Sequence, residues 1–145
     1  MVKVAIVYWS GTGNTRAMAH AIKEGVEHSG NAVEIFEVEQ FGVDDLKDYQ
    51  GFLFGCPAMG AEVLEEDSFE TFFAEAESHL KGVPVALFGS YGWGGGEWMR
   101  DWAERTRADG AKLFNEGLII ENGPTDADLD ACKKLGEDFA VSISG

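Results

Sequence analysis

Five short segments rich in Val, Ile, Leu and Phe alternate along the chain with longer stretches whose apolar residues recur at helical spacing. Short apolar runs of this kind are typical of strands in a parallel sheet that is covered on both faces. The alternation predicts repeated βα units forming one domain over residues 1–145. The expected strands are Lys3–Tyr8, Ala32–Phe36, Phe52–Cys56, Val83–Phe88 and Leu118–Glu121.

Four stretches between and after these strands carry one apolar face at the period of a helix. The run Thr125-Asp126-Ala127-Asp128 can cap the last of them at its N-terminus. The residues expected to face the core are Met18, Ala19, Ile22 and Val26 in the first helix, Phe69, Phe72, Phe73, Ala76 and Leu80 in the second, Trp98, Met99, Trp102 and Ala103 in the third, and Leu129, Cys132, Gly136, Phe139, Ala140 and Ile143 in the fourth.

Right-handed crossovers and short connections restrict such a chain to an α/β fold with few topologies. The simplest is a three-layer α/β/α sandwich with a five-stranded parallel sheet in the order 2-1-3-4-5. In open sheets of this type, ligands bind outside the carboxyl ends of the strands, where the strand order reverses. The loops after the first, third and fourth strands are therefore the candidate site.

The loop after the first strand, Ser10-Gly11-Thr12-Gly13-Asn14-Thr15, joins a buried strand directly to a helix. Its glycines permit a tight turn, and its hydroxyls, the Asn14 amide and the N–H groups at the helix start can converge on an anion. Arg16 stands where the dinucleotide pattern G-x-G-x-x-G needs glycine, and the nucleoside-triphosphate pattern is absent. A mononucleotide phosphate remains, as does a polar turn capped by Ser10 or Thr12 with nothing bound.

The loop after the third strand, Cys56-Pro57-Ala58-Met59-Gly60-Ala61-Glu62, combines a polarizable side chain with a flexible peptide. Met59 can lie against an aromatic ring, although most methionines after a buried strand fill core space. Gly60 relieves the steric limits on the turn, so its peptide can adopt more than one orientation.

The loop after the fourth strand, Gly89-Ser90-Tyr91-Gly92-Trp93-Gly94-Gly95-Gly96, places Trp93 among glycines. That setting favours an aromatic platform over a planar ligand more than it favours core packing. Trp98 and Trp102, four residues apart on a predicted helix, are expected in the core. Together the three loops describe a pocket for a planar aromatic group between Met59 and Trp93, with a phosphate at Ser10 to Thr15. Flavin mononucleotide (FMN) fits that description.

The chain carries 26 Asp and Glu against 11 Lys and Arg, for a formal net charge of −15. This charge disfavours nucleic acid and anionic membrane surfaces as partners and favours proteins with basic patches. Between Asp48 and Leu80 there are several carboxylates and no Lys or Arg. A solvated acidic face is the default interpretation of such a segment, and its place beside two ligand-type loops raises a functional alternative.

No apolar stretch approaches the ~20 residues of a transmembrane helix, and the N-terminal residues lack the parts of a signal peptide. The two cysteines, Cys56 and Cys132, lie in segments of different type, which suits a reducing compartment better than a disulfide framework. No exposed apolar face is evident beyond the predicted core. We therefore expect a cytoplasmic monomer without a membrane partner.

Three stretches in order resemble the short-chain flavodoxins: Tyr8-Trp9-Ser10-Gly11-Thr12-Gly13-Asn14-Thr15, Gly55-Cys56-Pro57-Ala58-Met59-Gly60 and Leu87-Phe88-Gly89-Ser90-Tyr91-Gly92-Trp93-Gly94. The resemblance covers essentially the whole chain, and the 2-1-3-4-5 order with FMN at the switch point is the family's known arrangement. It implies that Ser10, Thr12, Gly13, Asn14 and Thr15 hold the phosphate, Met59 and Trp93 cover the flavin ring, and Glu62 accepts from flavin N3. The wider implied contact set adds Gly11, Pro57, Ala58, Gly60, Ala61, Ser90, Tyr91, Gly92 and Gly94.

The resemblance also implies the activity: a low-potential one-electron carrier that shuttles between semiquinone and hydroquinone and substitutes for ferredoxin. The Gly60 carbonyl would turn toward flavin N5 when that atom takes up a proton. Two positions depart from the family pattern, because Arg16 stands where an acid is common and Ala61 where Asp or Ser is common. An FMN-dependent NAD(P)H:quinone reductase is the alternative, and an FMN-binding interaction module without redox activity is a third.

Overall fold

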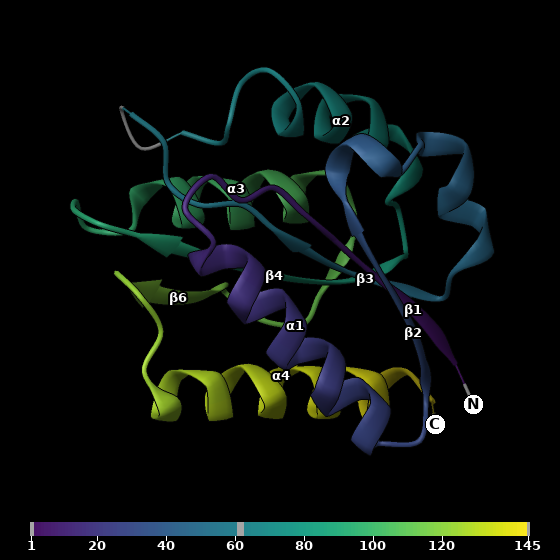
Figure 1. Cartoon of the computed structure of the whole chain (residues 1–145). Coiled ribbons are helices and arrows are strands. Elements are labelled where there is room, and N and C mark those ends of the chain that lie inside the picture. The colour runs from purple at the N-terminus through teal and green to yellow at the C-terminus, as the bar shows by residue number, and fades with distance from the viewer. Residues whose placement is uncertain (1, 61–62, 145) are drawn as a thin grey trace.

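The computed structural model describes residues 2–60 and 63–144, and within them a six-stranded parallel sheet lies between two layers of helices. Figure 1 shows α1 and α4 packed on one face of the sheet and α2 and α3 on the other. The strands are β1 (Lys3–Tyr8), β2 (Ala32–Glu37), β3 (Gly51–Gly55), β4 (Pro84–Tyr91), β5 (Lys112–Leu113) and β6 (Leu118–Glu121). The helices are α1 (Asn14–His28), α2 (Phe69–Ala76), α3 (Glu97–Ala108) and α4 (Asp126–Ser144), with 3-10 turns at Val38–Gln40, Val43–Asp48 and Glu77–His79.

The side chains of each central strand alternate between two separate cores, as the pleat of a strand requires. In β1, Ala5 and Val7 face α2 and α3, whereas Val4 and Ile6 face α1 and α4. Because both faces are covered, every residue of β3 is buried. The strand sequences therefore read as continuous apolar runs, which explains why they were recognisable.

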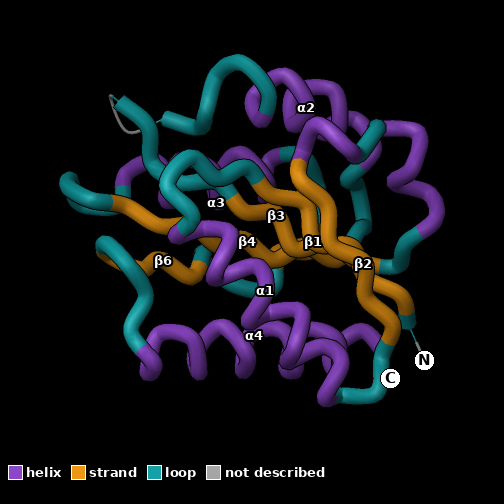
Figure 2. Tube along the Cα trace, in the orientation of Figure 1, coloured by secondary structure: helices purple, strands orange, loops and turns teal. Residues whose placement is uncertain are grey.

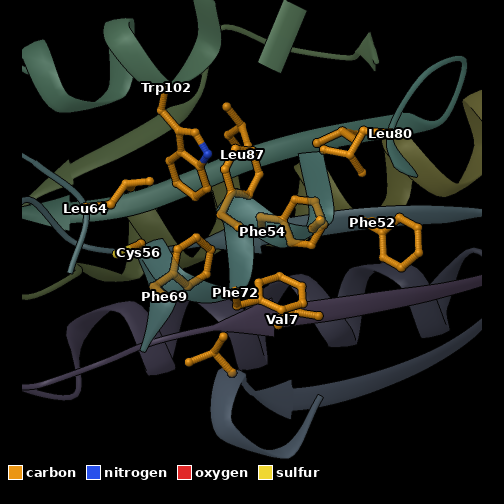
Figure 3. Packing of buried hydrophobic residues seen from close by; sticks show 14 of the residues in the cluster. Val7, Phe52, Phe54, Cys56, Leu64, Phe69, Phe72, Leu80, Leu87 and Trp102 are labelled. Carbon is orange, nitrogen blue, oxygen red and sulfur yellow. The ribbon is translucent and has the colours of Figure 1, made fainter. Parts of the chain in front are cut away.

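The core between the sheet and the α2–α3 layer is built largely from aromatic rings (Figure 3). Phe69 packs edge-to-face against Trp102, with ring centroids 5.3 Å apart. Trp98 and Trp102 are each about 1% exposed, which confirms their predicted place in the core. The predicted core face of the second helix begins with Phe69, as α2 does, but α2 ends at Ala76; Leu80, the last residue of that face, is fully buried just after the 3-10 turn that follows.

The strand order β2-β1-β3-β4-β5 confirms the predicted topology, but the fifth position is divided between two short strands. β5, which was not expected, pairs with Pro84 and Val85 at the start of β4, and β6 pairs with the last four residues of β4. A two-residue strand has too little sequence to show a period. β4 also continues beyond Phe88, where the predicted strand ends, because residues as far as Ser90 and Tyr91 pair with β6.

Asn115 lies between β5 and β6 in the sequence, and its side chain fills the gap between these two strands beside β4. Figure 2 shows β6 at the edge of the sheet next to β4. Its Oδ1 accepts from the Leu87 N–H, and its Nδ2 donates to the Leu87 carbonyl oxygen, both at 3.1 Å. The amide thus occupies the place of a strand residue beside the middle of β4.

The described part of the chain contains no helix that combines the length and apolar character needed to cross a membrane. α4 begins where Thr125 and Asp128 exchange hydrogen bonds: the Thr125 N–H donates to Asp128 Oδ2 and the Asp128 N–H to Thr125 Oγ1. This confirms the predicted cap. Cys56 and Cys132 are free and buried, in accord with the expectation that they form no disulfide.

Replacing Asn115 by alanine should lower the free energy of unfolding by about 1–3 kcal/mol, because the Leu87 N–H and carbonyl lose their partners in a half-buried position. Urea denaturation of wild type and Asn115→Ala measures the difference. Lys112→Ala, at an exposed position of β5, is the control and should change stability by less than about 0.5 kcal/mol. Equal stability of Asn115→Ala and wild type would show that β4 does not need this amide.

Candidate functional site

A cavity of about 330 Å³ opens at the carboxyl ends of the strands, on the left in Figure 1, where the loops after β1, β3, β4 and β6 meet. That volume lies at the lower end of the ~300–1,000 Å³ typical of small-ligand sites. The residues that line it are Trp9, Gly11, Thr12, Asn14, Pro57, Ala58, Met59, Ser90, Tyr91, Gly92 and Asn122. The structure therefore brings together residues from all three loops that the sequence singled out.

The loop between β1 and α1 is organised by the Ser10 side chain. Ser10 Oγ accepts the backbone N–H groups of Gly13 at 3.1 Å and of Arg16 at 3.3 Å. Gly13, the residue before α1, has a positive φ of 99° that glycine adopts without strain. The N–H groups of Asn14 and Thr15 lie in the first turn, where a helix offers them no partner. Ser10 thus caps this loop, and the N–H groups at the start of α1 are donors of the kind that can bind an anion.

Thr15 has a different role from its neighbours, because its side chain is fully buried. Thr15 Oγ1 lies 2.8 Å from Ser90 Oγ, which joins the start of α1 to β4. The hydroxyl is committed to that contact and does not line the cavity. Of Thr15, the backbone N–H is the group available to a phosphate.

The loop after β3 is pinned on one side and turns back on the other. The Ala58 N–H donates to the Ser90 carbonyl at 3.0 Å, and Met59 and Val63 exchange two backbone hydrogen bonds at 2.9 and 3.1 Å. Gly60, inside that turn, has a φ of +41°, and a Cβ placed there would meet nothing within 4 Å. The remaining two site predictions in this loop, Ala61 and Glu62, lie outside the described residues.

Trp93 stands apart from the cavity. Its side chain is 65% exposed, and the cavity lining includes neither Trp93 nor Gly94. Further along the same loop, Arg100 Nη1 donates to the Gly95 carbonyl at 2.6 Å, just before α3 begins. The structure thus brings Met59 to the cavity but does not bring Trp93 opposite to it.

Two cavity residues, Trp9 and Asn122, were not expected. Trp9 follows β1 directly, and its ring covers Gly11 so closely that a Cβ there would lie 2.9 Å from Trp9 Cη2. Asn122 follows β6 with a φ of +62°, and its N–H donates to the Tyr91 carbonyl at 2.7 Å. Two features of the sequence could have indicated these cavity residues: an aromatic residue directly after the first strand, and the turn-forming pair Asn122-Gly123 after the last strand.

A buried group of polar contacts supports the loop after β3 from below. Cys56 Sγ accepts the Glu65 N–H at 3.3 Å, and the Cys56 carbonyl accepts Trp98 Nε1–H at 3.0 Å. Burial raises the pKa of the Cys56 thiol to about 12, so it remains protonated and poorly nucleophilic at neutral pH. Glu65 Oε1 in turn accepts the N–H groups of Ser68 and Phe69 at 2.8 Å, where α2 begins.

The acidic segment between Asp48 and Leu80 is only partly a solvated face. Arg105 of α3 makes paired hydrogen bonds of 2.7–2.9 Å to both Glu70 and Glu77, and its guanidinium lies 4.9 Å from the centre of the Phe73 ring. Hydrogen bonding to Arg105 lowers the pKa of Glu77. Together with the buried Glu65, these carboxylates are structural, which differs from the interpretation of the whole segment as solvated.

The chain is similar to flavodoxins in all the comparisons. The flavodoxin family model matches residues 6–136. The flavodoxin of Clostridium beijerinckii is 46% identical over 93% of this chain and 97% of that protein, and that of Megasphaera elsdenii is 48% identical over 92% and 96%. The solution structure of two-electron reduced Megasphaera elsdenii flavodoxin superposes with a TM-score of 0.88, covering 95% of this chain and 98% of that one. An archaeal flavodoxin, 33% identical, gives 0.89 over 99% of both chains.

Asp109 should make stability depend on pH, because burial and then the nearby Glu77 raise the pKa of its carboxyl to about 6. Its unfolded pKa is about 3.9. The folded chain therefore binds more protons, and this contribution to stability is lost as pH rises from about 4 to about 6. Asp109→Asn should be more stable than wild type by about 1 kcal/mol at pH 7 and by less at pH 4.5. Urea denaturation at both pH values measures this.

Asp101→Asn, which neutralises an exposed carboxylate on the same helix, is the control for the general loss of one negative charge. If both variants gained the same stability at pH 7, relief of overall repulsion would explain the result and the local role of Asp109 would be wrong.

Proposed function

The chain belongs to the flavodoxin family, and from this premise we propose that it carries single electrons with an FMN held in the cavity at the carboxyl ends of the sheet. Flavodoxins bind FMN and are electron-transfer proteins rather than enzymes. The observation that carries the proposal is that Gly11, Asn14, Met59, Tyr91 and other residues of all three motifs line one cavity.

The residues around the cavity fit the two chemical ends of FMN. At one end, the first turn of α1 presents unpartnered N–H groups beside the hydroxyls of Ser10 and Thr12, a set of donors suited to a phosphate. At the other, Trp9, Met59 and Tyr91 supply apolar and aromatic surface suited to a planar ring. Gly11, between the donor end and the aromatic end, has no side chain and so leaves room for the Trp9 ring. We propose Ser10 to Thr15, Pro57 to Glu62 and Ser90 to Gly94 as the contact set, extended by Trp9 and Asn122.

The bound FMN supplies the one-electron chemistry, and the protein shifts its potentials through contacts and charge. The flavin ring would lie between apolar side chains in a chain with a net charge of −15. A further negative charge on that ring would therefore be costly. This supports a low potential for the final reduction step, and with it the proposal that the protein substitutes for ferredoxin.

Gly60 is the residue we propose to control the first reduction step. Gly60 has a positive φ, which glycine adopts without strain, and a Cβ placed there would meet nothing within 4 Å; both features support a turn in which the Gly60 carbonyl can change orientation. In one orientation the Gly60 carbonyl would accept a hydrogen bond from N5–H of a bound flavin and so would favour a proton at that atom. A bond of this kind contributes about 0.5–1.5 kcal/mol net.

Exposed carboxylates surround the carboxyl edge of the sheet, among them Glu66, Asp67, Asp101, Glu121 and Asp126. We propose that this acidic rim attracts redox partners through basic patches in small, transient contacts. Electron-transfer rates to a basic haem protein that did not change with ionic strength would contradict this.

We also propose that the protein is a single-domain monomer in the cytoplasm. The free, buried thiols of Cys56 and Cys132 support a reducing compartment.

The first test is an absorbance spectrum of the purified protein, followed by stepwise anaerobic reduction and by addition of NAD(P)H alone. The carrier function predicts bound flavin that is reduced in two separate one-electron steps and that NAD(P)H does not reduce directly. Rapid reduction by NAD(P)H with turnover of a quinone would instead identify a reductase. A colourless protein that does not bind added FMN would exclude both functions.

Gly60→Val should narrow the gap between the two one-electron potentials by about 20–60 mV, because valine disfavours positive φ and hinders the proposed carbonyl orientation. Spectroelectrochemical titration of the FMN-loaded protein measures the gap. Gly82→Val is a matched control, since Gly82 has a φ of +76° with nothing within 4 Å of a Cβ and lies before β4, at the opposite edge of the sheet. An unchanged gap in Gly60→Val, or an equal change in both variants, would count against the role of Gly60.

A further inference from the structure

Arg16 lies in the first turn of α1, immediately after the loop proposed to hold the FMN phosphate. Its backbone N–H donates to Ser10 Oγ at 3.3 Å, the same oxygen that accepts the Gly13 N–H. Arg16 is therefore anchored to this loop. In an α-helix, side chains lean toward the N-terminus, and the Arg16 side chain makes a hydrogen bond with Tyr8, the last residue of β1.

The position is unfavourable for a cation in the absence of a bound anion. The N-terminus of a helix carries partial positive charge, which disfavours Arg and Lys in the first turn by a fraction of a kcal/mol each. The first turn of α1 contains no acidic residue that could offset this. Among the described residues, Arg16 belongs to none of the ion pairs, whereas Lys23 on the same helix pairs with Glu27.

The surroundings of Arg16 place its charge at the carboxyl edge of the sheet. Tyr8, the last residue of β1, is buried, and burial followed by the charge of Glu37 raises the pKa of its hydroxyl. Arg16 is close enough to act against that rise through its charge and a hydrogen bond. Its side chain is otherwise exposed and does not line the cavity. Any effect of Arg16 on a ligand in the cavity must therefore act through the electric field across a short distance.

We propose that Arg16 makes this chain select the phosphorylated flavin, by adding a positive charge beside the neutral N–H and hydroxyl donors of Ser10–Thr15. This rests on the proposed function, because it assigns a specificity residue to the same site. A phosphate monoester carries about −1.5 to −2 charges at pH 7, whereas riboflavin has the same ring and no phosphate. Attraction by Arg16 also offsets the repulsion that a chain of net charge −15 exerts on an incoming dianion.

The experiment compares the affinities of the apoprotein for FMN and for riboflavin, measured by quenching of flavin fluorescence, in wild type and in three variants. Arg16→Gln removes the charge, Arg16→Lys retains it, and Lys23→Gln removes a charge from the same helix two turns further from the loop. Titrations at about 10 mM and about 1 M ionic strength separate field effects from contacts, because the Debye length falls from about 30 Å to about 3 Å.

At low ionic strength, Arg16→Gln should weaken FMN binding about fivefold and leave riboflavin binding within twofold of wild type. The effect on FMN should fall below twofold at high ionic strength, and Arg16→Lys should restore affinity. Lys23→Gln should change FMN binding by less than twofold, because its charge is more distant.

Equal losses for FMN and riboflavin would show that Arg16 acts on the shape of the loop, and would overturn the proposal. So would a loss for FMN that persists unchanged at high ionic strength, or an equal loss in Lys23→Gln, which would indicate net charge alone. Wild-type protein that binds neither flavin would refute the proposed function, and the role of Arg16 with it. Wild-type protein that binds both flavins while Arg16→Gln equals wild type would refute the role of Arg16 alone.

Discussion

Parallel pairing of the strands is the constraint on which the rest of the structure depends. Every paired strand of the described sheet runs in the same direction, so the carboxyl ends of all strands lie at one edge. Loops that are far apart in the sequence are thereby brought together at that edge (Figure 1). There they line one cavity. The pairing of Tyr91 with Glu121 extends this to the last loop, because it places Asn122 beside the loop after β4. The divided edge of the sheet is thus part of the site as well as of the fold.

The site combines a firmly connected base with less restrained tips. At the base, the buried Thr15–Ser90 contact and the Ala58–Ser90 backbone bond join α1 and the loop after β3 to β4, and the Trp98–Cys56 bond joins α3 to the residue after β3. At the tips, Trp93 is largely exposed and Gly60 occupies an open turn. The connected base suits a site that holds a cofactor in place, and the open turn at Gly60 is the one for which we propose a change of carbonyl orientation. The base differs from the tips because its polar groups make hydrogen bonds to buried partners.

Some of the negative charge of the chain is used in local contacts between elements. The chain has a large negative charge, yet several of its carboxylates are used to join elements: Glu65 holds the start of α2, and Glu70 and Glu77 bind Arg105. Other carboxylates are exposed: Asp44 and Asp48 precede β3, whereas Glu66, Asp67 and Glu121 lie in or beside the loops at the carboxyl edge of the sheet. An anionic cofactor can still be accommodated there, because the start of α1 presents N–H donors and Arg16 a positive charge.

The sequence by itself determined the strands and helices with long apolar patterns, the cap at Thr125 and the three loops of the site, because each of these depends on residues close together in the chain. The sheet order followed from general rules on crossover handedness and short connections. Only the tertiary structure decided which distant residues meet. Asn115 completes the sheet beside Leu87, and Arg105 binds carboxylates about thirty residues away. Trp9 and Asn122 enter the cavity, whereas Trp93 stays outside it. A lone Asn, Arg or Trp has no period, and its partner is chosen by the packing of whole elements, which no local pattern records.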